Sequence, residues 1–270
     1  MKRLCCLLAA LALSPFFSCE KADVNPEALA FKAAIEPTST RCYIGDEAAG
    51  VLPVLWSEGD VISVNGTLAV PLTASAEGVS EVEFRVVGAS LAAPYHLIYP
   101  GEEGVSSTIM LDGTLPPMYA AGDDTGQTFT FHQASAALRF TISGNLAAAS
   151  VSLSAPGGEG IVGRFGISFS DGSLSPVSAS PVWEKIYDTP KNLSAPESFT
   201  LFVAPGTYSN GLMITVEDPS GGASFWLFAK DIRLLAGKLY TLPDLSFNRP
   251  FGGWYVNLEE MDGDDVNFEL

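Results

Sequence analysis

In Glu81-Val82-Glu83-Phe84-Arg85-Val86, charged and apolar residues alternate strictly, and this pattern indicates the fold class. Successive side chains of a β-strand point to opposite faces, so this stretch places three apolar side chains on one face and three charged ones on the other. The alternation predicts a half-buried strand. The same period of two returns in four later segments, at 138–142, 151–153, 165–169 and 212–216.

Two further runs, 199–203 and 225–229, are almost continuously apolar, which is typical of strands covered on both faces. Turn-forming sequences separate the runs and supply the positive φ that tight hairpins need. No window of a dozen residues has a clean helical period, and only 26–30 and 147–150 have any helical character. We therefore expect an all-β fold with turns at Asn65-Gly66, Asp112-Gly113, Asp171-Gly172 and Ser220-Gly221-Gly222.

The chain is long enough for more than one β-sandwich, since a single sandwich needs about 100 residues. We expect two in tandem, an N-terminal one over 31–125 and a C-terminal one over 126–249. The boundary is placed at the glycine- and aspartate-rich stretch 122–126. Residues 19–30 are polar and are expected to form a tether, and 250–270 are expected to form a C-terminal tail.

The charge balance restricts the partners. Lys and Arg number 14 against 31 Asp and Glu, so the formal net charge is −17. This excludes nucleic-acid binding by a basic surface. With 47% hydrophobic and 17% charged residues the chain can bury a core. Three of the four cysteines fall within the first 19 residues, which excludes a disulfide framework.

The first segment has the pattern of an export signal. Lys2 and Arg3 precede an apolar run over 4–13, followed by small residues up to Cys19. This is typical of a secretory signal and too short for a membrane span. The alternative, a buried N-terminal helix, fits the two leading cations poorly. We expect a signal peptide over 1–18, with cleavage between Ser18 and Cys19.

The stretch 16–19 resembles a bacterial lipobox, and specifically the Ser-Cys boxes of Bacteroidota lipoproteins. The resemblance implies that Cys19 becomes the lipidated N-terminus. Because the acidic body is repelled by anionic headgroups, attachment to a membrane would depend on the acyl chains. Cys42 would then be the remaining cysteine, with no His or Lys nearby to make it reactive.

The sequence contains partial matches to catalytic and cofactor-binding motifs, but these matches lack the context that the motifs require. Gly158-x-Gly160-x-x-Gly163 matches the dinucleotide fingerprint, but that motif needs a helix directly after the glycines, and a strand is expected there. The two histidines, His96 and His132, lie in no catalytic or metal motif and are expected to be structural. The acidic cluster 262–265 lacks calcium-loop spacing. We assign no catalytic, cofactor or metal residues and expect no enzyme.

The segment Trp56-x-x-Gly59-Asp60-x-Ile62 resembles the Trp-x-x-Gly-Asp-x-Ile signature of the fimbrillin-like (Mfa-like) surface lipoproteins of Bacteroidota, the type V pilus subunits. Other family patterns follow in order, and the resemblance covers about 31–245. These are the Tyr-x-x-x-Tyr-Pro pattern at 95–100, the Gly-x-Leu-Pro turn at 113–116, the Phe-x-His stretch at 129–140, and the Ala-Gly-Lys-x-Tyr pattern at 236–240.

The resemblance implies two stacked transthyretin-like β-sandwiches and an outer-membrane lipoprotein at the cell surface. It further implies that a trypsin-like maturation protease removes an N-terminal segment. Loss of the first strand would leave a groove that a strand of another fimbrial subunit fills. The expected function is a structural subunit or anchor of a cell-surface fimbria that supports adhesion.

Particular residues of this sequence match the cleavage site and the donated strand that the resemblance implies. Arg41, followed by Cys42, comes after the strand-like 31–35 and is the candidate maturation site, with Lys32 as a second candidate and an ordinary surface cation as the alternative. In the tail, Trp254, Val256 and Leu258 share one side of an extended chain. They form a candidate donor strand, or else pair within their own domain.

Trp56 has two possible roles, a sugar-binding surface residue and a core residue. An exposed indole would suit a sugar platform, which fits the alternative function of a non-polymerising surface lipoprotein that binds glycans. An aromatic residue before a Gly-Asp turn and an apolar strand is more often part of a core. We expect Trp56 to be a core residue.

Overall fold

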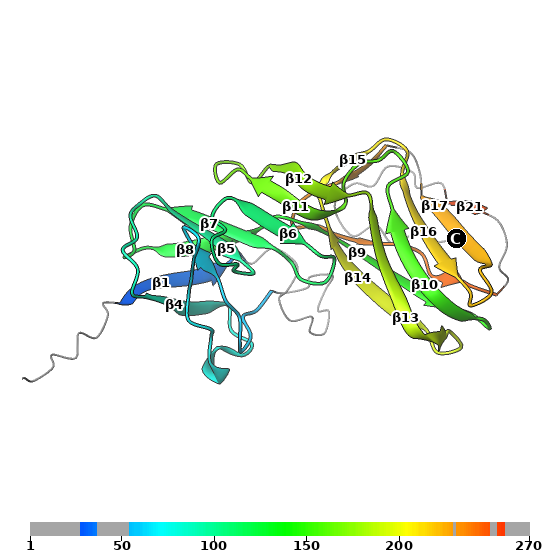
Figure 1. Cartoon of the computed structure of the whole chain (residues 1–270), viewed down its shortest axis with the longest axis horizontal. Helices are drawn as coiled ribbons and strands as arrows, with labels where there is room; N and C mark the ends of the chain where they lie inside the picture. Colours follow the sequence, from blue (N-terminus) through cyan, green and yellow to red (C-terminus); the bar gives the residue numbers. More distant parts are fainter. Residues whose placement is uncertain (1–27, 37–53, 229–230, 249–252, 257–270) are drawn as a thin grey trace, which may run out of the picture.

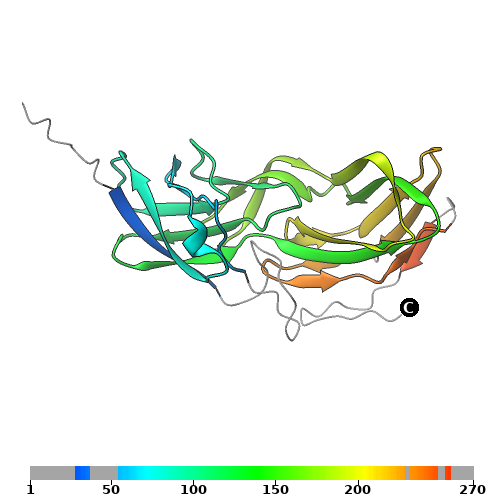
Figure 2. The ribbon, with the colours of Figure 1, turned by 90° about the horizontal axis from the view of Figure 1, so that it is seen from below.

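The computed structural model describes residues 28–36, 54–228, 231–248 and 253–256. The predicted all-β fold is confirmed, since the described residues form strands and one short 3-10 turn at Ala74–Ala76. The strands gather in two groups that lie end to end, so the molecule is elongated (Figures 1 and 2). None of the helical structure within these ranges is long and apolar enough to cross a membrane.

The N-terminal half is built on a seven-stranded sheet in the order β3-β2-β5-β7-β8-β1-β4. The first strand therefore lies inside the sheet rather than at its edge. The core of the N-terminal half holds Trp56, Phe84 and Phe131, each less than 2% exposed. The strands are β1 (Ala28–Ile35), β2 (Ser63–Val64), β3 (Thr67–Leu68), β4 (Glu81–Val87), β5 (Tyr95–Tyr99), β7 (Met118–Gly122) and β8 (Thr128–Gln133).

The C-terminal half is a sandwich, with a five-stranded sheet β13-β10-β16-β17-β21 and a four-stranded sheet of β14, β9, β19 and β20 around one core. A two-stranded sheet, β15-β18, completes this half. The strands are β9 (Ala136–Ser143), β10 (Ala147–Ser154), β13 (Val182–Asn192), β14 (Glu197–Val203), β15 (Gly206–Tyr208), β16 (Leu212–Glu217), β17 (Ala223–Phe228), β18 (Ile232–Leu234), β19 (Leu239–Thr241), β20 (Leu245–Ser246) and β21 (Gly253–Val256).

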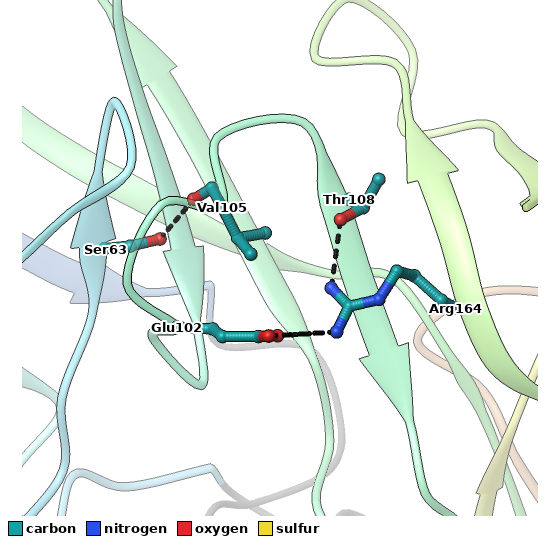
Figure 3. Close-up of polar contacts among 5 residues, drawn as sticks. All are labelled: Ser63, Glu102, Val105, Thr108 and Arg164. Atoms are coloured by element: carbon teal, nitrogen blue, oxygen red, sulfur yellow. Dashed lines mark hydrogen bonds and ion pairs between the residues drawn. The ribbon is translucent and has the colours of Figure 1, made fainter.

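A three-stranded sheet connects the halves, in the order β12-β11-β6. Strand β6 (Thr108–Leu111) comes from the N-terminal half, whereas β11 (Val162–Ile167) and β12 (Leu174–Ser180) belong to the C-terminal half. Ile109 and Phe165 meet in a small core of their own at this junction. Arg164 reaches from β11 to Glu102 and Thr108, while Ser63 donates to the Val105 carbonyl nearby (Figure 3).

Strand pairing differs in two places from the expected divisions of the chain. Strand β1 begins at Ala28, inside the segment expected to be a tether. Strand β8 follows the stretch 122–126 but still pairs with β7 and β1, so the N-terminal sheet continues to Gln133. Both differences arise because the ends of strands are fixed by their partners, which the local sequence does not show.

Candidate functional site

Strand β1 contributes three side chains to the N-terminal core. Phe31 and Ala33 are 0% and 1% exposed, and Ile35 is also buried, whereas Lys32 between them is exposed. The Phe31 ring lies 5.3 Å from Tyr95 and 5.7 Å from Phe129. The alternation of the sequence at 31–35 thus produces a strand with one buried face.

The backbone of β1 is paired along both edges. It runs antiparallel to β4 over Ala28 to Ala34, and parallel to β8 over Lys32 to Ile35. If β1 were absent, β4 and β8 would each expose an unpaired row of backbone donors and acceptors above an open apolar core. Such an edge is a template for another strand. We call the space between β4 and β8 the β1 groove.

The β1 groove ends at a charged contact. Glu36, the residue after β1, donates its backbone N–H to the Phe131 carbonyl at 3.1 Å. Its carboxylate oxygen Oε2 lies 2.7 Å from His132 Nδ1, so these two atoms share a hydrogen bond. Both side chains are a little under half exposed. Sequence reasoning missed Glu36, whose one local signal is its place after the last inward residue of the strand.

A cavity of about 330 Å³ surrounds this contact. Burial raises the pKa of Tyr119, and the charges of Asp171 and Glu36 raise it further. The Tyr119 hydroxyl therefore stays protonated beside the His132 ring, whose centroid is 5.7 Å away. The cavity is lined by Glu36, Tyr119, His132, Gln133, Ala236, Gly237 and Lys238.

The family patterns noted in the sequence converge on Trp56, which is fully buried. Its ring meets Phe84, Tyr99 and Phe131 edge to face, with centroids 5.1, 5.6 and 5.3 Å away. Tyr99 belongs to the Tyr-x-x-x-Tyr-Pro pattern and Phe131 to the Phe-x-His stretch. The expectation that Trp56 is a core residue is confirmed, and this indole offers no surface to a sugar.

The Gly-Asp pair after Trp56 has a structural reason. Gly59 has φ +86°, a conformation that favours glycine. Asp60 Oδ2 accepts the Ser57 backbone N–H at 2.8 Å, and Oδ1 accepts the Tyr99 hydroxyl at 2.8 Å. Burial raises the pKa of Asp60, although these two hydrogen bonds act against the rise. The signature is therefore a turn that fixes Trp56 in the core.

The residues expected to act in maturation fall mostly outside the described ranges. Ser18, Cys19, Arg41, Cys42 and Leu258 all lie there. Lys32 is described, and its backbone is paired with both Glu83 of β4 and Thr128 of β8. A protease needs a free extended chain, so Lys32 is a poor cleavage site while β1 is in place.

Two of the three candidate donor residues lie on β21. This strand pairs in parallel with β17, with Trp254 opposite Trp226 and Val256 opposite Phe228. It forms the edge of the five-stranded sheet (Figure 1). In the isolated chain the start of the tail therefore pairs within its own domain, which was one of the two expected arrangements.

The motifs that the sequence analysis set aside have structural explanations. Gly163 lies on strand β11, and no helix follows the glycine pattern, as expected. The His96 ring stacks on Phe169 at 4.0 Å with an interplanar angle of 8°, which is a packing contact between the two halves. Among the described residues, no group of three or more His, Cys, Asp or Glu side chains is arranged to hold a metal ion.

Comparison with solved structures identifies the fold. A candidate cell adhesion protein from Bacteroides ovatus superposes with a TM-score of 0.51 at 14% identity, over 83% of this chain and 93% of that one. This chain shares its fold. A second candidate cell adhesion protein, from Bacteroides uniformis, gives a TM-score of 0.49 at 18% identity, over 81% and 94%.

A fimbrial protein from Bacteroides ovatus gives a TM-score of 0.36 at 11% identity, over 86% of this chain and 50% of that one. No protein-family model matches the sequence, and no curated protein matches it either. The fold is therefore shared with a solved Bacteroides protein at low sequence identity, as the resemblance noted in the sequence implied.

Proposed function

We propose that the protein is a structural subunit or anchor of a cell-surface fimbria and supports adhesion. Its role is structural rather than enzymatic. It is exported as an outer-membrane lipoprotein attached through Cys19, and a trypsin-like protease cuts after Arg41. Other fimbrial subunits then assemble with it by exchange of strands.

The place of β1 carries this proposal. Strand β1 lies inside a sheet, is paired on both edges, and is joined to the other described strands only through its C-terminal end. One cut between Glu36 and Val54 therefore separates β1 from the other described strands without breaking any of those strands. Arg41 falls within this interval. The vacated groove offers two backbone edges and the apolar sites of Phe31, Ala33 and Ile35 to a donated strand.

The test is an analysis of the surface-extracted protein by intact mass and by gel, before and after limited trypsin treatment. We expect an acylated precursor that starts at Cys19, then a fragment that starts at Cys42 and forms multimers resistant to mild detergent. The variant Arg41→Gln should remain uncut and monomeric. The matched control Lys32→Gln should be cut and assemble like the wild type. A wild-type fragment that starts at Cys42 but stays monomeric would contradict strand exchange.

A further inference from the structure

The contact between Glu36 and His132 lies where β1 leaves its groove. Glu36 precedes Arg41 in the chain, so a cut after Arg41 removes it together with β1. Among the described residues that line the cavity, Glu36 supplies the carboxylate, whereas His132 and Lys238 supply the basic groups. Asp171 acts on Tyr119 but does not line the cavity. Without β1, the cavity keeps its basic groups and loses its carboxylate.

The β1 groove thus has four requirements in a fixed order. It accepts an aromatic side chain at the Phe31 position, aliphatic ones at the Ala33 and Ile35 positions, and then a carboxylate at the Glu36 position. The required carboxylate also fixes the direction in which a strand enters the β1 groove. A strand that entered the groove the other way round would place its acidic residue far from His132.

One other glutamate in the chain has this pattern before it. In Trp254-Tyr255-Val256-Asn257-Leu258-Glu259, an aromatic residue stands five positions before the glutamate, and aliphatic residues stand three and one before it. The same order occurs in Phe31-Lys32-Ala33-Ala34-Ile35-Glu36. Trp254 is larger than Phe31, and Val256 is larger than Ala33, so the groove must open at both positions.

We propose that His132 recognises the carboxylate that follows the strand in the β1 groove, and that Glu259 of a second copy supplies this carboxylate after maturation. The inference rests on the proposed function, and it adds the register, the direction and the specificity contact of the donated strand. His132 is a positioning residue that selects an occupant with an acidic residue directly after its last inward side chain.

The first test uses the uncut precursor and does not depend on assembly. Hydrogen exchange of the β1 amides reports how firmly β1 is held. Glu36→Gln should speed this exchange by roughly two- to fivefold, the range expected for a partly exposed ion pair. Glu81→Gln, on the neighbouring strand β4, is the matched control and should have little effect. The double variant Glu36→Lys with His132→Glu swaps the two groups and should restore slow exchange of the β1 amides. Each of the two single variants should exchange faster than the wild type.

The second test uses the trypsin-cut protein and two synthetic peptides of residues 253–260, one natural and one with Gln in place of Glu259. The natural peptide should block multimer formation at a concentration about two- to fivefold lower. With His132→Gln as the receiving protein, this difference should disappear.

The outcomes separate the two proposals. Multimers that both peptides block equally well would overturn the role of His132 and Glu259 while leaving strand exchange intact. A cut wild-type protein that forms no multimers would overturn the proposed function and, with it, the role of Glu259. Exchange rates that are equal for Glu36→Gln and Glu81→Gln would overturn recognition of the carboxylate by His132 in either case.

Discussion

Arg164 holds Glu102 across the junction between the two halves of the protein. Its Nη2 lies 3.0 Å from Oε1 and 2.9 Å from Oε2 of the carboxylate, and its Nη1 donates to the Thr108 hydroxyl at 3.2 Å. The arginine side chain is 25% exposed, so the pair is partly shielded from water. This contact fixes the loop before β6 against β11, and thereby reinforces the strand pairing that connects the halves.

Replacing Arg164 with Met should lower the free energy of unfolding by about 1 kcal/mol, because Glu102 and Thr108 lose their partner at the junction. Arg85→Met is the matched control, since Arg85 pairs with Glu83 on the same strand and is 65% exposed. It should change stability by less than about 0.5 kcal/mol. Urea unfolding measures both. Equal effects of the two substitutions would mean that the junction contact stabilises the fold no more than the exposed pair of Arg85 with Glu83.

Trp56→Ala should cost about 3–5 kcal/mol, because it leaves a large cavity among three aromatic rings. The loss should be confined to the N-terminal half, whose core is separate from that of the C-terminal half. Hydrogen exchange should therefore rise in β4 and β8 much more than in β16. Leu68→Ala, at a residue 36% exposed, is the control and should be mild. A uniform rise in both halves would contradict this separation.

Gly163→Ala should be strongly destabilising. Gly163 has φ +106°, and an added Cβ would lie 2.4 Å from the Ser178 carbonyl oxygen on the paired strand. Gly221 has φ +86° with open space around it, so Gly221→Ala should cost only the backbone strain, about 1–2 kcal/mol. Thermal unfolding of the two variants compares the costs. If Gly163→Ala unfolded at the same temperature as Gly221→Ala, the close approach of β11 and β12 would be in doubt.

Stability should fall in acid partly because of Glu197. Burial alone would raise the pKa of this carboxyl, but Lys185 Nζ at 2.7 Å outweighs it, with help from Tyr187 and Lys191, and the pKa lies below its usual value. A lowered folded pKa adds stability above the unfolded value of about 4.3. That stability is lost as the pH falls through the folded pKa.

Glu197→Gln should therefore flatten the pH dependence of unfolding in the acidic interval below about pH 4.3, the unfolded pKa. Glu184→Gln, at an exposed position on β13, should leave the curve like that of the wild type. Melting temperatures recorded across this interval provide the measurement. A Glu197→Gln curve as steep as the wild-type curve would show that this carboxylate is not responsible.

Local periodicity predicted the strands that bury one face. The segments that became β4, β9 and β16 alternate in sequence, and their buried residues alternate in the same way. The run 225–229 shows the limit of this signal. It was expected to be covered on both faces, yet Phe225 is 37% exposed, because one face of β17 is not fully covered. Strand β13 was not predicted at all, and its Ile186 is 73% exposed.

Contacts between distant segments could not be predicted from the sequence. Asp112-Gly113 was expected to make a tight hairpin turn. Instead, Asp112 Oδ1 accepts the Thr114 backbone N–H at 2.7 Å, and Gly113 pairs with Phe202 of the other half. The partners of β1 and the contact of Glu36 with His132 could not be predicted from the sequence for the same reason. They depend on packing between segments that are far apart in the chain.

The pairing of β6 with β11 also has a mechanical consequence. The two strands belong to different halves, and they run obliquely along the long axis (Figure 1). Traction on the two ends of the molecule would load their four residue pairs in shear. The pairs would then have to slip together, instead of opening one after another as in a peeled edge. A subunit linked in series with others would transmit such a pull through this sheet as well as through the covalent link between β8 and β9.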